Sequence, residues 1–87
     1  MTYEGWKNRQ TWNVSLWINN EEPYYRAAVD FMADYKGQNP YKDFVQDCGL
    51  SVQKTPDGYK YLSRELDYKQ LNFMMWDLAP DGARKVQ

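Results

Sequence analysis

R-Q-T-W-N-V-S-L-W-I-N-N, at residues 9–20, is compatible with a strand or with a helix, and the fold class depends on which of the two forms. Apolar and polar side chains alternate along its centre, and a period of two is typical of a β-strand. The same residues also form apolar pairs four positions apart, such as Trp12 with Leu16, which in a helix would lie in the core. Asn8 or Thr11 could cap that helix. The periodicity therefore leaves helix and strand both open.

The residues that follow predict a helix over about 21–36. Asn20 stands where an N-cap is expected, and Pro23 lies in the first turn, where proline is tolerated. Gly37 occupies the position at which a glycine commonly ends a helix. The apolar residues form one stripe with its edges: Tyr24, Ala28, Phe31, Tyr35, Ala27 and Met32.

A shorter helix of about ten residues is predicted next, from Asn39 as cap and Pro40 in the first turn to Gly49. Leu50 can then make the hydrophobic contact that often accompanies a glycine stop. Around the turn sequence T-P-D-G, polar and apolar residues alternate. Residues 51–62 are therefore compatible with a small β-hairpin.

The last predicted helix spans about residues 67–78. Asp67 followed by Gln70 resembles a capping box, and Pro80 and Gly82 would stop the helix. Apolar residues surround this helix, so it is either central in the fold or half-covered by a partner. One face carries Tyr68, Leu71, Met74, Met75 and Leu78, and Phe73 and Trp76 point the other way.

These elements predict a mostly α fold, a compact bundle of about four short helices in a single domain over residues 1–87. Aromatic residues make up 17% of the chain, roughly double the average share, while the mean hydropathy is −0.92. A small domain needs large side chains to bury enough area. Aromatic residues are also preferred anchors of protein interfaces, so the excess is compatible with partner binding too.

The sequence predicts a soluble protein of the cytoplasm. Cys48 is the single cysteine, so no disulfide can form within the chain. The first residues have no secretory signal pattern, and no apolar run reaches the roughly 18 residues of a membrane span. We therefore expect the host-cell cytosol and no membrane association. The sequence leaves the oligomeric state open.

Histidine is absent, which removes the usual general base and the commonest transition-metal ligand. With a single cysteine, neither a zinc site nor a Ser-His-Asp or Cys-His hydrolase can be assembled. No glycine-rich loop has the spacing that cradles a phosphate. We therefore expect no enzyme, with no catalytic residue, no cofactor and no metal.

Two pairs of aspartates stand four residues apart, Asp30 with Asp34 and Asp43 with Asp47. Paired carboxylates can hold Ca²⁺ or Mg²⁺ or perform glycosidase chemistry. Both pairs lie away from the predicted apolar stripes, where charges are usually solvated. Because like charges at this spacing destabilise a helix slightly, the functional alternative is an acidic patch that meets a basic surface on a partner.

The net charge of −1 gives no general attraction to nucleic acid. Near the start of the chain, Lys7 and Arg9 lie beside Trp6 and Trp12, a combination that can neutralise phosphates and stack on bases. Two cations form a small footprint. Nucleic acid is therefore the alternative partner and not the expected one.

Residues 6–20, W-K-N-R-Q-T-W-N-V-S-L-W-I-N-N, resemble the opening of a family of small proteins of unknown function that bacteriophages and mobile elements encode. In that family N-R-x-T-W-N-V-x-L-W-I-x-N is followed by an acidic turn and a tyrosine-bearing helix, here residues 21–25. Residues 67–77 resemble the family's closing helix. The resemblance implies a mostly helical fold with a helix over residues 9–19, against the alternation, and it brings no catalytic residues.

The genomic setting of that family implies a function by analogy. Small phage accessory proteins without enzyme motifs often inhibit a host defence or host enzyme, and anti-CRISPR proteins do so by docking on the CRISPR effector. We therefore expect a non-enzymatic protein that binds and inhibits a host protein complex, with an anti-CRISPR protein as the specific hypothesis. The alternative is a small nucleic-acid-binding accessory protein that uses Trp6, Lys7 and Arg9. The expected partner-binding residues are Trp17, Phe73, Trp76, Asp30, Asp34, Asp43 and Asp47.

Overall fold

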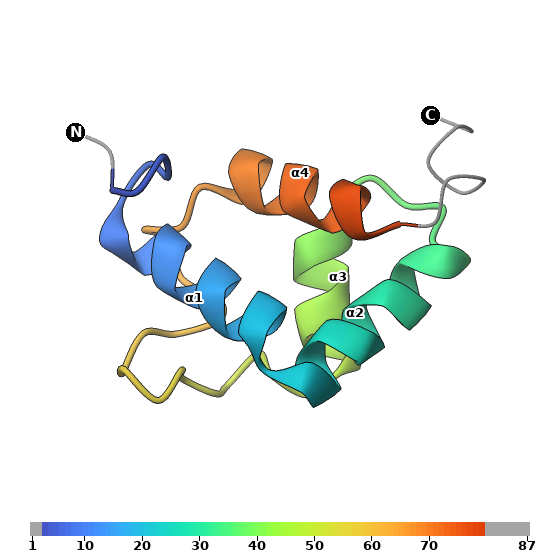
Figure 1. The fold of residues 1–87 in the computed structure, drawn as a ribbon, viewed down its shortest axis with the longest axis horizontal. Helices are drawn as coiled ribbons and strands as arrows, with labels where there is room; N and C mark the ends of the chain where they lie inside the picture. The colour runs from blue at the N-terminus through green and yellow to red at the C-terminus, as the bar shows by residue number, and fades with distance from the viewer. Residues whose placement is uncertain (1–2, 80–87) are drawn as a thin grey trace.

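A computed structural model describes residues 3–79 of the chain. Within this range the chain forms four helices joined by loops (Figure 1): α1 (Arg9–Asn20), α2 (Glu22–Ala33), α3 (Pro40–Asp47) and α4 (Tyr68–Leu78). The described residues form no strand longer than an isolated bridge. The prediction of a mostly α bundle of about four short helices is confirmed.

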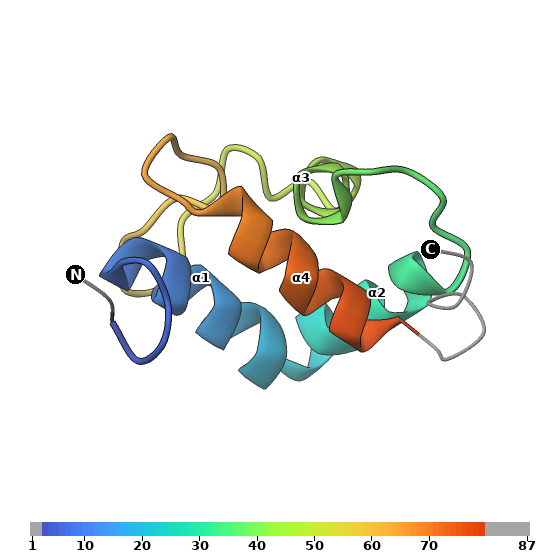
Figure 2. The same ribbon diagram turned by 90° about the horizontal axis from the view of Figure 1, so that it is seen from above.

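The helices α2 and α4 occupy central positions in the bundle, since each contacts all three of the other helices. Figure 2 looks almost along the axis of α3, whereas α1, α2 and α4 lie across the view, so α3 crosses the others steeply. Within residues 3–79, no helix has both the length and the apolar character needed to cross a membrane.

Residues 9–20 form the helix α1, so the strand alternative is wrong. Asn8 caps it, since its Oδ1 accepts a hydrogen bond from the Thr11 backbone N–H at 2.9 Å. The buried residues of α1 are Thr11, Asn13, Val14, Ser15 and Ile18, and all but Asn13 follow the three- and four-residue spacings of a helix. Trp12 and Leu16 are only half-buried, so the expectation that they lie in the core is also wrong.

The helix α2 differs from its prediction at both ends. Asn20 is the last residue of α1, and Glu21 takes the N-cap position without a side-chain capping bond. The helix ends at Ala33, three residues earlier than predicted, because the Tyr35 side chain forms hydrogen bonds with residues at and just before the start of α3. Its hydroxyl accepts a hydrogen bond from the Asn39 N–H at 3.0 Å. Gly37 does not cap the helix; a Cβ there would overlap the Tyr35 hydroxyl.

The helix α3 follows its prediction closely. Asn39 is the N-cap residue and Pro40 the first helical residue. Gly49 has φ +73°, the left-handed conformation that glycine adopts most easily. The Leu50 N–H donates to the Val45 carbonyl at 2.8 Å, and both side chains are buried. The predicted glycine stop with its hydrophobic contact is therefore confirmed.

The helix α4 begins one residue after Asp67, whose carboxylate accepts a hydrogen bond from the Gln70 N–H at 3.0 Å. Only this half of the predicted capping box forms, because the Asp67 N–H donates to the Thr11 hydroxyl instead. The described chain ends before the predicted stops, Pro80 and Gly82, which lie outside it.

The region of the suggested hairpin, residues 51–62, is a turn closed by one antiparallel bridge between Lys54 and Lys60. Two tyrosines of the buried core, Tyr41 and Tyr61, are joined by a hydrogen bond. The Tyr41 hydroxyl donates to the Tyr61 carbonyl at 2.7 Å, and both rings are almost fully buried. Among the described residues the buried core contains three aromatic residues, Tyr41, Phe44 and Tyr61, and is otherwise made of aliphatic residues and methionine.

Candidate functional site

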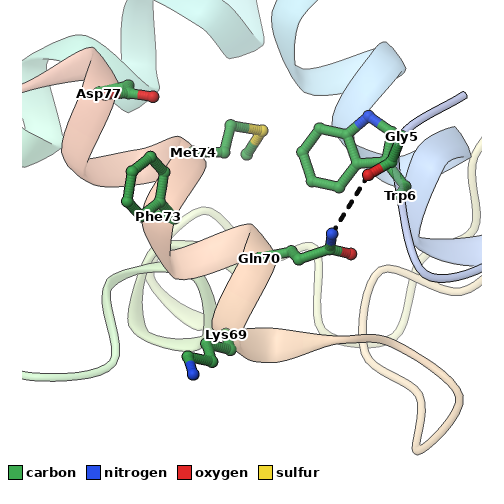
Figure 3. Close-up of a pocket in the computed structure, with 7 residues that line it drawn as sticks. All are labelled: Gly5, Trp6, Lys69, Gln70, Phe73, Met74 and Asp77. Atoms are coloured by element: carbon green, nitrogen blue, oxygen red, sulfur yellow. Dashed lines mark hydrogen bonds between the residues drawn. The ribbon is translucent and has the colours of Figure 1, made fainter.

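A groove of about 500 Å³ lies between the N-terminal turn and α4 (Figure 3). The turn closes through two backbone hydrogen bonds, from Tyr3 N–H to the Trp6 carbonyl at 2.6 Å and from Trp6 N–H to the Tyr3 carbonyl at 2.8 Å. Both residues between them have positive φ, 51° at Glu4 and 87° at Gly5, as a tight two-residue turn requires. This turn positions Trp6 as one wall of the groove.

Gln70 joins the turn to α4. Its Oε1 accepts from the Lys7 N–H at 2.8 Å, and its Nε2 donates to the Gly5 carbonyl at 3.3 Å. Figure 3 shows Gln70 and Met74 extending from α4 toward the turn. One side chain therefore fixes the separation between Trp6 and the helix, and with it the width of the groove.

The α4 side of the groove is largely apolar. Met74 is almost fully buried there, with its sulfur 3.2 Å from the Asn19 Nδ2. Phe73 stands beside it with 66% of its surface exposed. Lys69 and Asp77 line the groove one helical turn to either side of Phe73, and both are exposed. The groove is thus an apolar surface with charges of opposite sign toward its two ends.

Of the three aromatic residues predicted to bind a partner, only Phe73 projects freely. Trp17 is half-buried, and its Nε1 donates to Asp57 Oδ2 at 2.9 Å. Trp76 is half-buried and packs on the core, with its ring 5.6 Å from that of Tyr35. Both tryptophans thus contact other parts of their own chain.

Asp57 connects α1 with the loop that carries the bridge. The same Oδ2 also accepts from Asn13 Nδ2 at 2.8 Å. The buried Thr55 hydroxyl donates to the other amide atom of Asn13, Oδ1, at 2.7 Å. The hydrogen bonds from Asn13 and Trp17, together with the nearby charge of Arg9, lower the pKa of Asp57. Two residues of α1, Asn13 and Trp17, therefore hold this loop in place.

The four predicted aspartates are all exposed. Asp43 accepts a hydrogen bond from the Tyr35 hydroxyl at 2.5 Å, and burial of that phenol, followed by this bond, raises the pKa of Tyr35 to about 12. Asp34 caps the end of α2 and Asp30 lies within it. No cluster of three or more acidic or cysteine side chains in residues 3–79 could hold a metal ion.

The residues of the nucleic-acid alternative lie in the N-terminal turn and at the start of α1, each in different surroundings. Trp6 packs on the core and lines the groove. The Arg9 guanidinium lies over the Tyr3 ring at 5.8 Å, and Lys7 is exposed.

Gly5, Gln70 and Met74 line the groove but were not predicted from the sequence as site residues. Gln70 had a signal, its place in a capping box, but the signal pointed to a local role and not to the distant turn.

The comparisons with known proteins give one match. The model of a family of unknown function, DUF7249, matches residues 1–83. Neither the curated proteins nor the solved structures contain a match.

Proposed function

We propose that this chain, which belongs to the DUF7249 family, works by binding a partner protein, and that the groove beside Phe73 receives an apolar side chain of that partner. The proposal is for a binding protein and not an enzyme. The lack of histidine supports the second half, because the usual general base is missing.

Phe73 is the observation that carries the proposal. Phe73, in the middle of α4, has 66% of its surface exposed and adjoins the apolar surface of the groove. A single exposed apolar residue is ordinary, whereas an exposed ring continuous with an apolar groove forms a patch of the kind that marks interaction sites. Burying such a ring fully contributes about 1.5–3 kcal/mol. The groove with Trp6 and Met74 lies next to the ring, so a partner can cover the ring and fill the groove together. Central aromatic residues in apolar surroundings are typical hot spots of protein interfaces.

The charges at the groove indicate the kind of partner segment. Lys69 and Asp77 lie eight residues apart on α4, about 12 Å along a helix. An amphipathic helix of the partner that lies along α4 would present an acidic side chain near Lys69, an apolar one at the groove and a basic one near Asp77. This is the helix-in-groove mode of peptide recognition.

The finer proposal concerns the partner's identity. The resemblance of residues 6–20 to phage-encoded proteins supports an accessory protein that inhibits a host protein complex, with a CRISPR effector as the specific candidate. The aspartates of α2 and α3 would then meet basic patches on that complex, outside the groove.

The test compares two exposed aromatic residues. Affinity capture from host cytosol uses tagged wild-type protein, Phe73→Ala and the matched control Tyr25→Ala, since Tyr25 is exposed on α2 away from the groove. We expect one captured protein to depend on Phe73 alone. With that protein purified, Phe73→Ala should weaken binding by about 2 kcal/mol, or about 30-fold in Kd, and Lys69→Glu should also weaken it.

Stability measurements separate binding from folding. Phe73→Ala and Tyr25→Ala should each change the free energy of unfolding by less than about 0.5 kcal/mol. Trp76→Ala, at a half-buried site packed on Tyr35, should cost about 2 kcal/mol. Equal loss of binding in the two exposed variants would exclude the groove. Failure of the chain to inhibit a purified CRISPR effector would overturn only the finer proposal.

A further inference from the structure

We propose that a second concavity, formed by residues 54–65 with α1, binds single-stranded nucleic acid through Lys54, Lys60 and Arg64. This inference is independent of the Phe73 groove. It rests on three cations that the sequence separates and the fold brings to one place.

The two lysines are held side by side by the backbone. Lys54 and Lys60 form the antiparallel bridge of the loop. The hydrogen bonds around it run from Thr55 N–H to the Tyr59 carbonyl at 2.7 Å and from Tyr61 N–H to the Gln53 carbonyl at 3.2 Å. The lysines themselves are therefore a non-hydrogen-bonded pair, whose side chains leave the same face and lie closest together. Like charges directly opposite are destabilising, so an anion between them is favoured.

The third cation extends this pair. Arg64 lines the same concavity of about 430 Å³ as both lysines, and all three side chains are exposed. None of the three forms an ion pair with another described residue. Glu65 is the one acidic residue of the lining, and its carboxylate already accepts a hydrogen bond from the Ser63 hydroxyl. The concavity therefore holds an excess of positive charge, although the whole chain has a net charge of −1.

The rest of the lining fits a nucleotide. Half-buried Tyr59 and Leu62 offer ring and apolar surface beside the cations, and Gln10 and Ser63 add polar groups. Aromatic side chains that stack on bases, next to cations that follow the phosphates, are the usual combination for binding single strands. Arginine can also grip a phosphate through two parallel hydrogen bonds. Three separate cations suit successive phosphates of a strand better than one free nucleotide.

The test measures the fluorescence anisotropy of a labelled oligothymidylate at low and increasing salt. Three phosphate contacts predict a slope of log K against log salt of about −2, from about −0.7 per phosphate in single strands. Lys54→Gln/Lys60→Gln should weaken binding at least about tenfold at low salt and reduce the slope by about 1.4. Because it removes a repulsive pair, this variant should unfold at the wild-type temperature or slightly above it.

Controls assign the binding to this concavity. Lys36→Gln/Lys42→Gln makes the same change in net charge outside it and should bind like wild type. Unlabelled thymidine monophosphate should compete at least about 100-fold more weakly than the oligonucleotide.

Several results would overturn the proposal: no binding at low salt, loss of binding in Lys7→Gln/Arg9→Gln but not in Lys54→Gln/Lys60→Gln, and equally good competition by thymidine monophosphate or by polyglutamate.

Discussion

Asp57 shows how a single exposed residue can organise a loop. One of its carboxylate oxygens accepts hydrogen bonds from both Asn13 and Trp17. In the same loop, the Thr55 hydroxyl donates a hydrogen bond to Asn13. The W-N-V-x-L-W part of the opening motif therefore has a structural role. Trp17, which was predicted to bind a partner, contacts this loop in the isolated chain.

The hydrogen bonds at Asp57 should make this contact sensitive to acid. They lower the pKa of Asp57 below its ordinary value of 3.8. A depressed pKa in the folded state means that the stabilisation is present above pH about 4 and is lost as the pH falls through the folded-state pKa. We expect the Trp17 indole N–H resonance to move in that acidic range.

The comparison variant Asp57→Ala should show the acid-shifted Trp17 resonance at neutral pH, while Asp30→Ala should leave it unchanged. A Trp17 resonance that is the same in Asp57→Ala and in the wild-type protein would contradict this role.

Among the helices, the ends that depend on residues close by in the sequence could be predicted from the sequence. Asn39, Pro40 and Gly49 mark α3, and Asp67 marks the start of α4, because caps and glycine stops act within a few residues. The end of α2 was not predictable, since it depends on where Tyr35 finds partners in α3 and α4. The N-terminal turn likewise depends on a distant residue, Gln70.

Replacing Gln70 should release the N-terminal turn from α4 without melting the helix. In Gln70→Ala the Lys7 N–H and the Gly5 carbonyl both lose their partner, while Asp67 still accepts from the backbone N–H of residue 70. We expect local opening to become easier by about 1 kcal/mol, so the Lys7 amide should exchange its hydrogen about fivefold faster. Hydrogen exchange followed by NMR measures this directly.

Gln46→Ala is the matched control, because Gln46 is an exposed glutamine on another helix, α3. Exchange at Lys7 should stay at the wild-type rate there. If α4 amides exchanged as fast as Lys7 in Gln70→Ala, Gln70 would be supporting the helix and not the turn.

For the whole molecule, the buried phenols link the fold to alkaline pH. Burial raises the pKa of Tyr41 well above its ordinary value and that of Tyr61 to about 12. A raised pKa in the folded state means that the stabilisation is complete below pH about 10 and is lost as the pH rises toward the folded-state pKa. The helical bundle should therefore be destabilised between pH 10 and 12.

The measurement combines phenolate absorbance with helical circular dichroism during one titration. Fewer than the eight tyrosines should ionise while the helical signal persists, and the remainder should ionise as it disappears. In concentrated urea all eight should ionise together near pH 10. Full ionisation with an intact helical signal would show that these rings are accessible to solvent.

The helical class and the starts of α3 and α4 could be predicted from the sequence, because caps and glycine stops act locally. The missing histidine chemistry follows from composition alone. The resemblance of residues 6–20 resolved the stretch at residues 9–20 as a helix when periodicity did not. The packing of the helices determines which side of α1 is buried, why Trp76 packs on Tyr35 while Phe73 is exposed, and how Gln70 sets the width of the groove. The fold also brings Lys54, Lys60 and Arg64 together. The three cations meet through a local turn, whereas the other features depend on contacts between residues far apart in the chain, about which a local pattern carries no information.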